Sequence, residues 1–239
     1  MSRRPRGRMV WACMAWRGDG AERSAAYDFV YDWIEKSDIA VTTSDAGGHP
    51  FKRAASRNMA AESAISNGAD ILIFHDADMV IPRVSYREMI DLADDTGQIV
   101  VGFDEYRALG PAESLQVVKR NLDPFSARTA NVLRNFSVGG VVAVRADLFQ
   151  KVGGYDTRFH GWGCEDFAFA IACNLLSGGP TLRTENAGVH LWHVHGTTES
   201  NRYVQEHNGR LLNAYSACET VEQYRLLRAS PDYRWSDER

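Results

Sequence analysis

Ile71-Leu72-Ile73-Phe74-His75-Asp76-Ala77-Asp78 is the stretch that decides the fold of this chain. The apolar run from Ile71 to Phe74 follows the turn sequence Asn67-Gly68-Ala69-Asp70, which is typical of a buried parallel strand. In an open α/β sheet, ligands bind at the edge where such a strand ends. Two carboxylates separated by one residue offer hard oxygen ligands to Mg²⁺ or Mn²⁺ there. Taken alone, a solvated Asp-Ala-Asp turn explains the pair equally well.

Apolar runs alternate with helical patterns on both sides of this stretch. Strands are expected at Arg8–Trp16, Ile39–Thr43, Ile71–Phe74, Gln98–Phe103, Phe136–Arg145 and from Thr181 toward Trp192. Helices are expected around Ala26–Ile34, Ala54–Ser66, Ser85–Asp94 and Asp166–Leu176. This rhythm predicts one α/β domain with a mostly parallel sheet flanked by helices. Residues 104–135 are polar and are expected to form loops with one or two short helices.

The composition fits one globular domain. The chain has 239 residues, 44% of them hydrophobic, and a net charge of −4, which argues against a general nucleic-acid coat. We expect a flexible basic tail over residues 1–8, a main domain over 9–198 and a charged helical extension over 199–239. The run Met9–Ala15 is too short to span a membrane, so no membrane partner is expected.

The cysteines indicate a reducing compartment. They form no Cys-x-x-Cys pair and no dense disulfide spacing; they are Cys13, Cys164, Cys173 and Cys218. Reduced thiols and a cytoplasmic location are therefore expected.

A second motif, Gly161-Trp162-Gly163-Cys164-Glu165-Asp166, supplies candidate catalytic carboxylates about ninety residues later. Asp166 lies at a predicted helix start, where free backbone N–H groups are expected to favour its ionised form. A plain carboxylate in a first helical turn is the simpler explanation. That explanation leaves out the adjoining Gly-Trp-Gly, whose glycines and large aromatic side chain can form a mobile platform for a sugar.

Two further patterns point to ligand contacts. The pair Gly139-Gly140 either lets a ligand approach the backbone closely or marks a β-bulge. His190, His193 and His195 place three imidazoles within six residues, which is enough to propose a transition-metal site. On a regular strand His193 and His195 share a face while His190 does not, so the partner of His193 stays open. We also expect a mobile lid over residues 195–203, which lack a hydrophobic period.

Four separated segments, in the same order, resemble the β-1,4-galactosyltransferase family and its bacterial chondroitin-synthase-like relatives. They are Phe51-Lys52-Arg53-Ala54, Ile73 to Pro82, Phe136 to Val141 and the Gly161–Asp166 segment, which resembles the C-terminal galactosyltransferase motif. The resemblance implies a GT-A fold and a metal-dependent, inverting sugar transfer. Ala15-Trp16-Arg17 departs from the family's usual Pro-aromatic-Arg, and His75 stands where a small residue is common.

The resemblance also implies roles for individual residues. Asp166 matches the catalytic base, with Glu165 beside it, and Asp78 and His193 match metal ligands, with His190 on a second ligand position. The residues that match or adjoin donor-contact positions are Arg17, Asp45, Phe51, Arg53, Asp76, Gly139, Gly140 and Trp162. Chemistry agrees in part, since arginine suits diphosphate oxygens and an aromatic face suits uracil. Asp45, at the end of the second predicted strand, could accept a hydrogen bond from the nucleoside, but a loop cap is the likelier explanation.

These observations together predict an enzyme that moves a sugar from a UDP-sugar, of the UDP-Gal, UDP-GalNAc or UDP-Glc type, with Mn²⁺ or Mg²⁺ as cofactor. The acceptor hydroxyl is expected on a glycan, a protein or a hydroxylated DNA base, in a bacterial or phage-infected cell. One alternative is a retaining enzyme similar to the N-acetylgalactosaminyltransferases. Another is a non-catalytic module that binds a nucleotide sugar or a carbohydrate.

Overall fold

The structure is a computed structural model that describes residues 7–18, 20–48, 51–161, 163–194 and 202–233. Six strands form the main sheet in the order β2-β1-β3-β8-β5-β9. Their bounds are β1 (Val10–Ala15), β2 (Ala40–Ser44), β3 (Ile71–His75), β5 (Val100–Val101), β8 (Val141–Arg145) and β9 (Leu182–Arg183). β1 runs parallel to β2 and β3, and β5 parallel to β9, while β8 is antiparallel to both of its neighbours.

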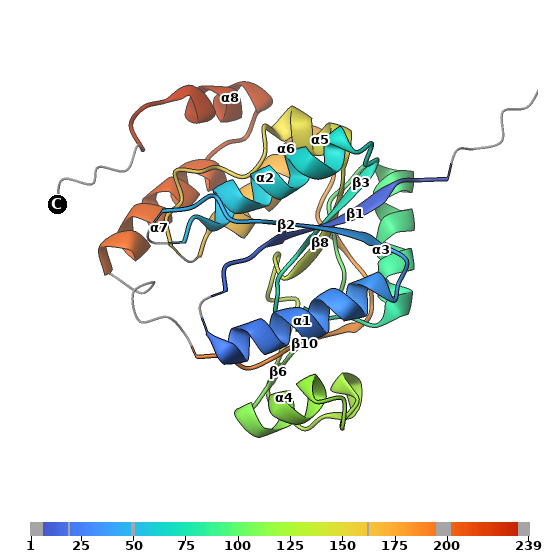
Figure 1. The fold of residues 1–239 in the computed structure, drawn as a ribbon. Helices are drawn as coiled ribbons and strands as arrows, with labels where there is room; N and C mark the ends of the chain where they lie inside the picture. The colour runs from blue at the N-terminus through green and yellow to red at the C-terminus, as the bar shows by residue number, and fades with distance from the viewer. Residues whose placement is uncertain (1–6, 19, 49–50, 162, 195–201, 234–239) are drawn as a thin grey trace, which may run out of the picture.

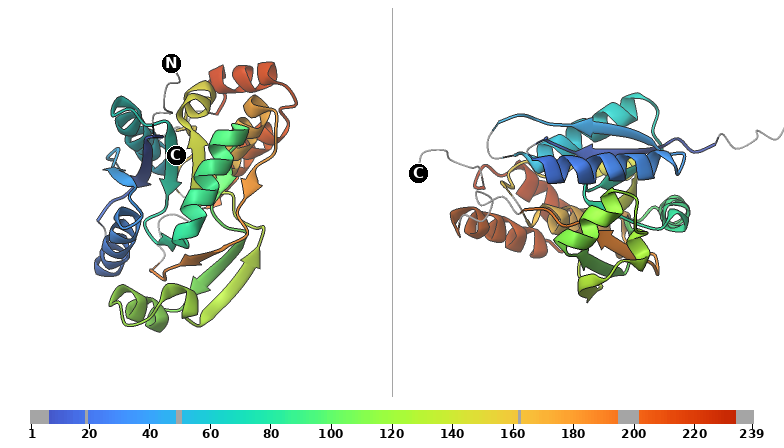
Figure 2. Two further views of the ribbon diagram at one scale, coloured as in Figure 1. Left: turned by 90° about the vertical axis from the view of Figure 1, so that its right-hand side faces the viewer. Right: turned by 60° about the horizontal axis from the view of Figure 1, so that its bottom comes forward.

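A second sheet of four strands has the order β4-β10-β6-β7. It consists of β4 (Met79–Val80), β6 (Glu105–Leu109), β7 (Thr129–Arg134) and β10 (Ala187–His190). Figure 2 shows β6 and β7 beside helix α4 (Pro111–Val118), at the other end of the molecule from the C-terminal helices. A 3-10 turn, η1 (Pro124–Ser126), lies between α4 and β7.

Helices cover both faces of the main sheet (Figure 1). α2 (Arg53–Ser66), α5 (Ala146–Val152) and α6 (Glu165–Ser177) lie on one face, and α1 (Ala21–Glu35) and α3 (Arg83–Thr96) on the other. The side of α2 that packs on β1 is rich in alanine, and these small side chains let helix and strand approach closely. α3 ends at Gly97, whose positive φ of 69° suits a residue without a Cβ.

The C-terminal helices α7 (Arg202–Ser216) and α8 (Val221–Ala229) pack against α6. Leu211, Tyr215 and Tyr224 are buried in the same core as the sheet. Thr220 and Gln223 form a capping box that fixes the start of α8. The division of the chain at residue 198 stays a prediction, and residues 1–6 of the expected tail lie outside the described residues.

The α/β fold with a largely parallel sheet is confirmed, whereas several strand boundaries differ from the predicted ones. Residues 104–135 contain α4 and η1, which agree with the one or two short helices expected there. They also contain the strands β6 and β7, where loops were wrongly expected. The strand predicted at Phe136–Arg145 begins only at Val141, and the one predicted from Thr181 is two short strands. Side chains of β7 are mostly exposed, so this strand exists through pairing with β6 and leaves no apolar pattern in the sequence.

Of the helices that the structure describes, none is long and apolar enough to cross a membrane.

Candidate active site

The parallel strands β1, β2 and β3 bring polar side chains to one edge of the main sheet. Arg17 follows β1, Asp45 follows β2, and Asp76 follows β3. Because β8 is antiparallel to β3 and pairs Val141 with His75, the preceding glycines enter at the same edge. The backbone N–H of Asp76 donates a 2.7 Å hydrogen bond to the carbonyl oxygen of Gly140. This edge is the ligand-binding edge of an open α/β sheet.

Asp78, His190 and His193 form a compact group beside this edge. Each of the three residues offers one candidate ligand atom, a carboxylate oxygen or an imidazole nitrogen. These three atoms all lie within 4.8 Å of one another. Asp78 Oδ2 is 3.0 Å from His193 Nε2 and 3.7 Å from His190 Nε2. β10 ends at His190, and the backbone N–H of Leu191 donates to the Asp78 carbonyl at 2.8 Å. The alternation of side chains along a strand therefore stops at His190. The irregular chain beyond β10 places His193 on the same side as His190, facing Asp78.

The electrostatics of this group suit a cation. Burial alone disfavours the charge on Asp78, yet His190 and His193 hold the pKa of that carboxyl well below its usual value. The hydrogen bond with Asp78 raises the pKa of His193. One carboxylate and two imidazoles fit Mn²⁺ better than Mg²⁺, which prefers oxygen ligands throughout.

A second charged group lies at the start of α6. Arg57 Nη1 donates to Asp166 Oδ1 at 2.5 Å, and Arg57 Nη2 donates to Asp76 Oδ1 at 2.7 Å. Arg53, one turn earlier on α2, donates to Glu165 Oε1 at 3.1 Å. Glu165 is almost fully buried, whereas 21% of the Asp166 side chain remains exposed. Only Asp166 can therefore meet a substrate without rearrangement.

The expected depression of the Asp166 pKa is wrong. Burial raises the pKa of Asp166 to about 6, with Glu165 and Asp76 adding to the rise and Arg57 opposing it. Asp166 does lie in the first turn of α6, as predicted, but removal from water outweighs the helix terminus. A carboxylate with this pKa suits proton transfer near neutral pH better than an ordinary aspartate does.

Gly139 makes room for this carboxylate. A Cβ atom at position 139 would lie 2.5 Å from Asp166 Oδ2, closer than real Cβ contacts come. Gly140 has a positive φ of 87°, which side chains rarely tolerate. The glycine pair therefore brings the backbone close to the Asp166 carboxylate and shapes the entry to β8.

Arg17, Asp45 and Phe51 lie together at the ends of β1 and β2 and the start of α2. Arg17 donates to both carboxylate oxygens of Asp45, at 2.6 and 2.7 Å, and its Cζ lies 5.1 Å from the centroid of the Phe51 ring. Hydrogen bonding from Arg17 lowers the pKa of Asp45. The structure thus brings these three predicted donor contacts together.

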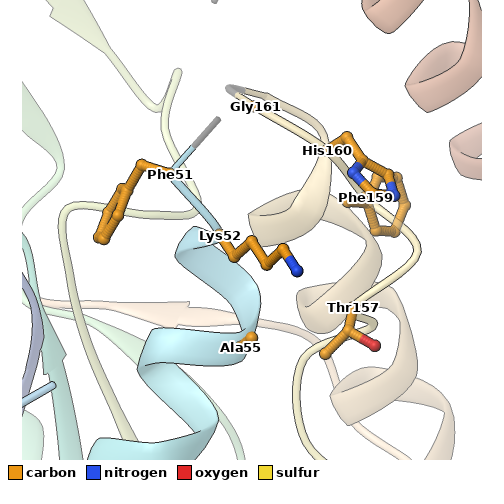
Figure 3. A pocket seen from close by; sticks show the side chains of 7 residues that line it. All are labelled: Phe51, Lys52, Ala55, Thr157, Phe159, His160 and Gly161. Carbon is orange, nitrogen blue, oxygen red and sulfur yellow. The ribbon is translucent and has the colours of Figure 1, made fainter. Parts of the chain in front are cut away.

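A cavity of about 280 Å³ opens between the start of α2 and the chain leading to α6. Figure 3 shows that Lys52 extends toward the side of Thr157 and His160, while the Phe51 ring points the other way. Gly161 borders the cavity. The cavity thus lies between the predicted nucleotide contacts and the Gly-Trp-Gly segment.

The Gly-Trp-Gly segment is held by the C-terminal helix α7. Asn208 accepts a hydrogen bond from the His160 N–H and donates to the carbonyl oxygens of His160 and Gly163. Its side chain is buried. Trp162 and His195 lie outside the described residues, as do positions 195–201 of the expected lid; Arg202 and Tyr203 begin α7.

Arg57 and Asn208 were not predicted as site residues. Arg57 follows Arg53 by four residues, so both lie on one side of α2. That spacing was the available signal. The sequence held no comparable signal for Asn208, because a single asparagine in a charged helical segment is typical of an exposed face. His75 is buried and hydrogen-bonded to Tyr86, and burial lowers its pKa to about 4, so it is a neutral support for the site.

Comparison with solved structures identifies the fold as that of GT-A glycosyltransferases. The catalytic domain of Drosophila β1,4-galactosyltransferase 7, solved with xylobiose, has a TM-score of 0.53 at 18% identity, covering 84% of this chain and 79% of that one. GalNAc-T7, solved with UDP, GalNAc and Mn²⁺, has a TM-score of 0.52 at 14% identity, covering 85% of this chain. The match spans 47% of the GalNAc-T7 chain.

Residues 132–175 match the family model described as the N-terminal domain of galactosyltransferase. The matched stretch contains Gly139, Gly140, Glu165 and Asp166. No curated protein sequence matches the chain. The predicted resemblance and the GT-A fold are confirmed, and the predicted enzyme class is that of the matched family and of both solved structures.

Proposed function

We propose that this chain is a metal-dependent, inverting glycosyltransferase that uses a UDP-sugar as donor. The observation that carries the proposal is the meeting of two groups at one sheet edge. Asp78, His190 and His193 form the candidate metal site, and Asp166 is joined to Asp76, two residues before Asp78, through Arg57. A metal site and a catalytic carboxylate are the two parts that such a transfer needs.

Asp78, His190 and His193 would hold Mn²⁺, which supplies charge neutralisation for the departing diphosphate when bound. GalNAc-T7 was solved with UDP and Mn²⁺, which supports the same pair here. Arg17 and Phe51 are proposed to hold the uridine diphosphate, and Arg53, Asp76, Gly139, Gly140 and Trp162 to complete the donor site. The ionised carboxylate of Asp45 orients Arg17.

Asp166 is proposed as the general base. Its carboxylate accepts the proton of the acceptor hydroxyl as that oxygen attacks the anomeric carbon from the face opposite the diphosphate. The new glycosidic bond forms while the bond between the anomeric carbon and the phosphate oxygen breaks, and UDP leaves with the electron pair. Glu165 is buried against Arg53 and keeps that arginine in place.

A retaining transfer is the second candidate, because GalNAc-T7 fits this fold about as well as the galactosyltransferase does. The two reactions differ in the anomeric configuration of the product. Proton NMR of the glycoside formed from an α-linked UDP-sugar would show a β-linkage for inversion and an α-linkage for retention. An α-linked product would overturn the inverting proposal and leave the donor and metal sites in place.

The acceptor hydroxyl is proposed to belong to a glycan, a protein or a hydroxylated DNA base. All four cysteines are free, which supports action in a reducing compartment such as the cytoplasm.

A screen of UDP-sugars tests the proposed function. UDP-Gal, UDP-GalNAc and UDP-Glc are incubated with the protein and Mn²⁺, and released UDP is measured with and without a chelator. We expect UDP release from at least one donor, with water or an added hydroxyl compound as acceptor, and loss of that release with chelator. A protein that binds UDP-sugars but releases no UDP under any of these conditions would be a non-catalytic module.

A further inference from the structure

We propose that Arg57 is a positioning residue that fixes the orientation and the basicity of Asp166 and joins this carboxylate to Asp76. The role in turnover rests on the proposed function, whereas the effect on Asp166 itself does not.

Two carboxylates and an aromatic ring surround the Arg57 guanidinium. Its side chain is only 3% exposed, and its two terminal nitrogens donate to Asp166 at 2.5 Å and to Asp76 at 2.7 Å. Its Cζ lies 4.9 Å from the centroid of the Tyr155 ring. A planar guanidinium held between two carboxylates and an aromatic face has one orientation available, and it fixes both carboxylates in turn.

Among the residues that the structure describes, Arg57 is the cation in direct contact with Asp166. Two ionisable groups that face Asp166, Glu165 on α6 and Asp76 after β3, oppose its negative charge. The phenol of Tyr155 stays neutral, because burial raises its pKa well above the usual value. Arg53 and Arg57 on α2 favour the charge. Arg53 makes its hydrogen bond to Glu165, so Arg57 provides the main support for ionised Asp166.

The contacts of Asp166 determine which of its two oxygens can accept the proton of the acceptor hydroxyl. Arg57 contacts Oδ1 of Asp166, while Oδ2 faces Gly139, where a side chain is missing. The proton from an acceptor hydroxyl is therefore accepted at Oδ2. Because the same guanidinium holds Asp76, which is proposed to contact the donor, Arg57 keeps the base and the donor contact in register.

The pKa of Asp166 can be measured directly by ¹³C NMR of the metal-free protein labelled at the aspartate side-chain carboxyls. Asp166→Asn assigns the resonance. We expect Arg57→Gln to raise the pKa of Asp166 by about 1 to 3, the usual effect of losing an adjacent opposite charge. Arg145→Gln is the matched control, because Arg145 pairs with Ile71 at the opposite end of β3. An unchanged Asp166 titration in folded Arg57→Gln would overturn the proposal.

A second pair of variants covers the case in which Arg57→Gln fails to fold. Glu165→Gln and Glu165→Gln/Arg57→Gln are compared, since the double variant removes one buried charge of each sign. The pKa of Asp166 is expected to be higher in the double variant by a similar amount, and equal values in the two variants would overturn the proposal.

Turnover provides the last readout. In a positioning role, Arg57→Gln lowers UDP release from the donor at pH 7, and part of the loss is recovered as the pH is raised to about 9, because Asp166 ionises again. A loss that is the same at every pH would contradict the assigned effect on basicity. Absence of turnover in the wild-type protein would reject the proposed function, while the NMR result would still decide the role of Arg57.

Discussion

At the scale of single residues, the site depends on small features that place one carboxylate. Gly139 and Arg57 approach Asp166 from two sides, one by lacking a side chain and the other by donating a hydrogen bond. Neither residue is itself proposed to react. The position of Asp166 is thus set by the chain leading into β8, by α2 and by α6 together.

Gly139→Ala tests this dependence. The new Cβ would lie 2.5 Å from Asp166 Oδ2, so the carboxylate must move. A displacement of about 1 Å can cost about 10²-fold in rate, and we expect a loss of that order in UDP release. Gly209→Ala in α7 is the control, because a Cβ at position 209 would meet no atom within 4 Å. It should leave turnover unchanged and stabilise the fold by about 0.5–1 kcal/mol, as measured by urea unfolding. Wild-type turnover in Gly139→Ala would contradict the placement.

Asp166→Asn should change stability in a pH-dependent way. The folded pKa of about 6 lies above the value of about 3.9 for an unfolded chain, so the folded state binds the proton more tightly. The stabilisation is complete below pH 4 and is lost as pH rises through 6. The wild type should therefore lose about 2 kcal/mol relative to Asp166→Asn between pH 4 and 7. Urea unfolding at several pH values measures the difference, and a difference independent of pH would refute the raised pKa.

At the scale of elements, α7 supports the chain around Gly161 and Gly163 from outside the sheet. Asn208 makes three hydrogen bonds to the backbone on either side of Gly161 and Trp162. Asn208→Ala should destabilise the protein by about 1–3 kcal/mol, because the half-buried backbone groups of His160 and Gly163 lose their partner. Hydrogen exchange should show loss of protection at His160, and UDP release should fall. Unchanged exchange at residues 160–163 would mean that α7 does not hold this segment.

Sequence patterns predicted the elements that carry their own periodicity and missed those that depend on pairing. The strand Ile71–His75 is buried along its whole length, so its apolar run predicted it from the sequence. β4 has only two residues and β7 is mostly exposed, and both exist through their neighbours in the second sheet. The same limit applies to the site. Asp78 and His193 carried a motif, whereas Arg57 becomes a site residue only because α2 and α6 pack around the β3 edge.

At the scale of the whole molecule, two sheets meet at the candidate metal site. β3 in the main sheet leads into Asp76 and Asp78, and β10 in the second sheet brings His190 and His193. The antiparallel pairing of His190 with Met79 lies within the second sheet and holds the end of β10 beside the chain that follows β3. A bound metal would therefore tie the sheets together, and Mn²⁺ should raise the thermal unfolding temperature of the wild type but not of His193→Ala. Equal stabilisation of both proteins would place the ion elsewhere.

Calorimetric titration of UDP into the protein tests the central claim, a metal-held nucleotide diphosphate, most directly. With Mn²⁺ present, UDP should bind the wild type at least about tenfold more tightly than with a chelator, because Asp78, His190 and His193 would hold the ion and its charge would attract the diphosphate. Asp78→Ala should lose this difference, and Asp147→Ala, at the opposite end of the sheet, should keep it. Equal UDP affinity with Mn²⁺ and with chelator in the wild type would contradict the account.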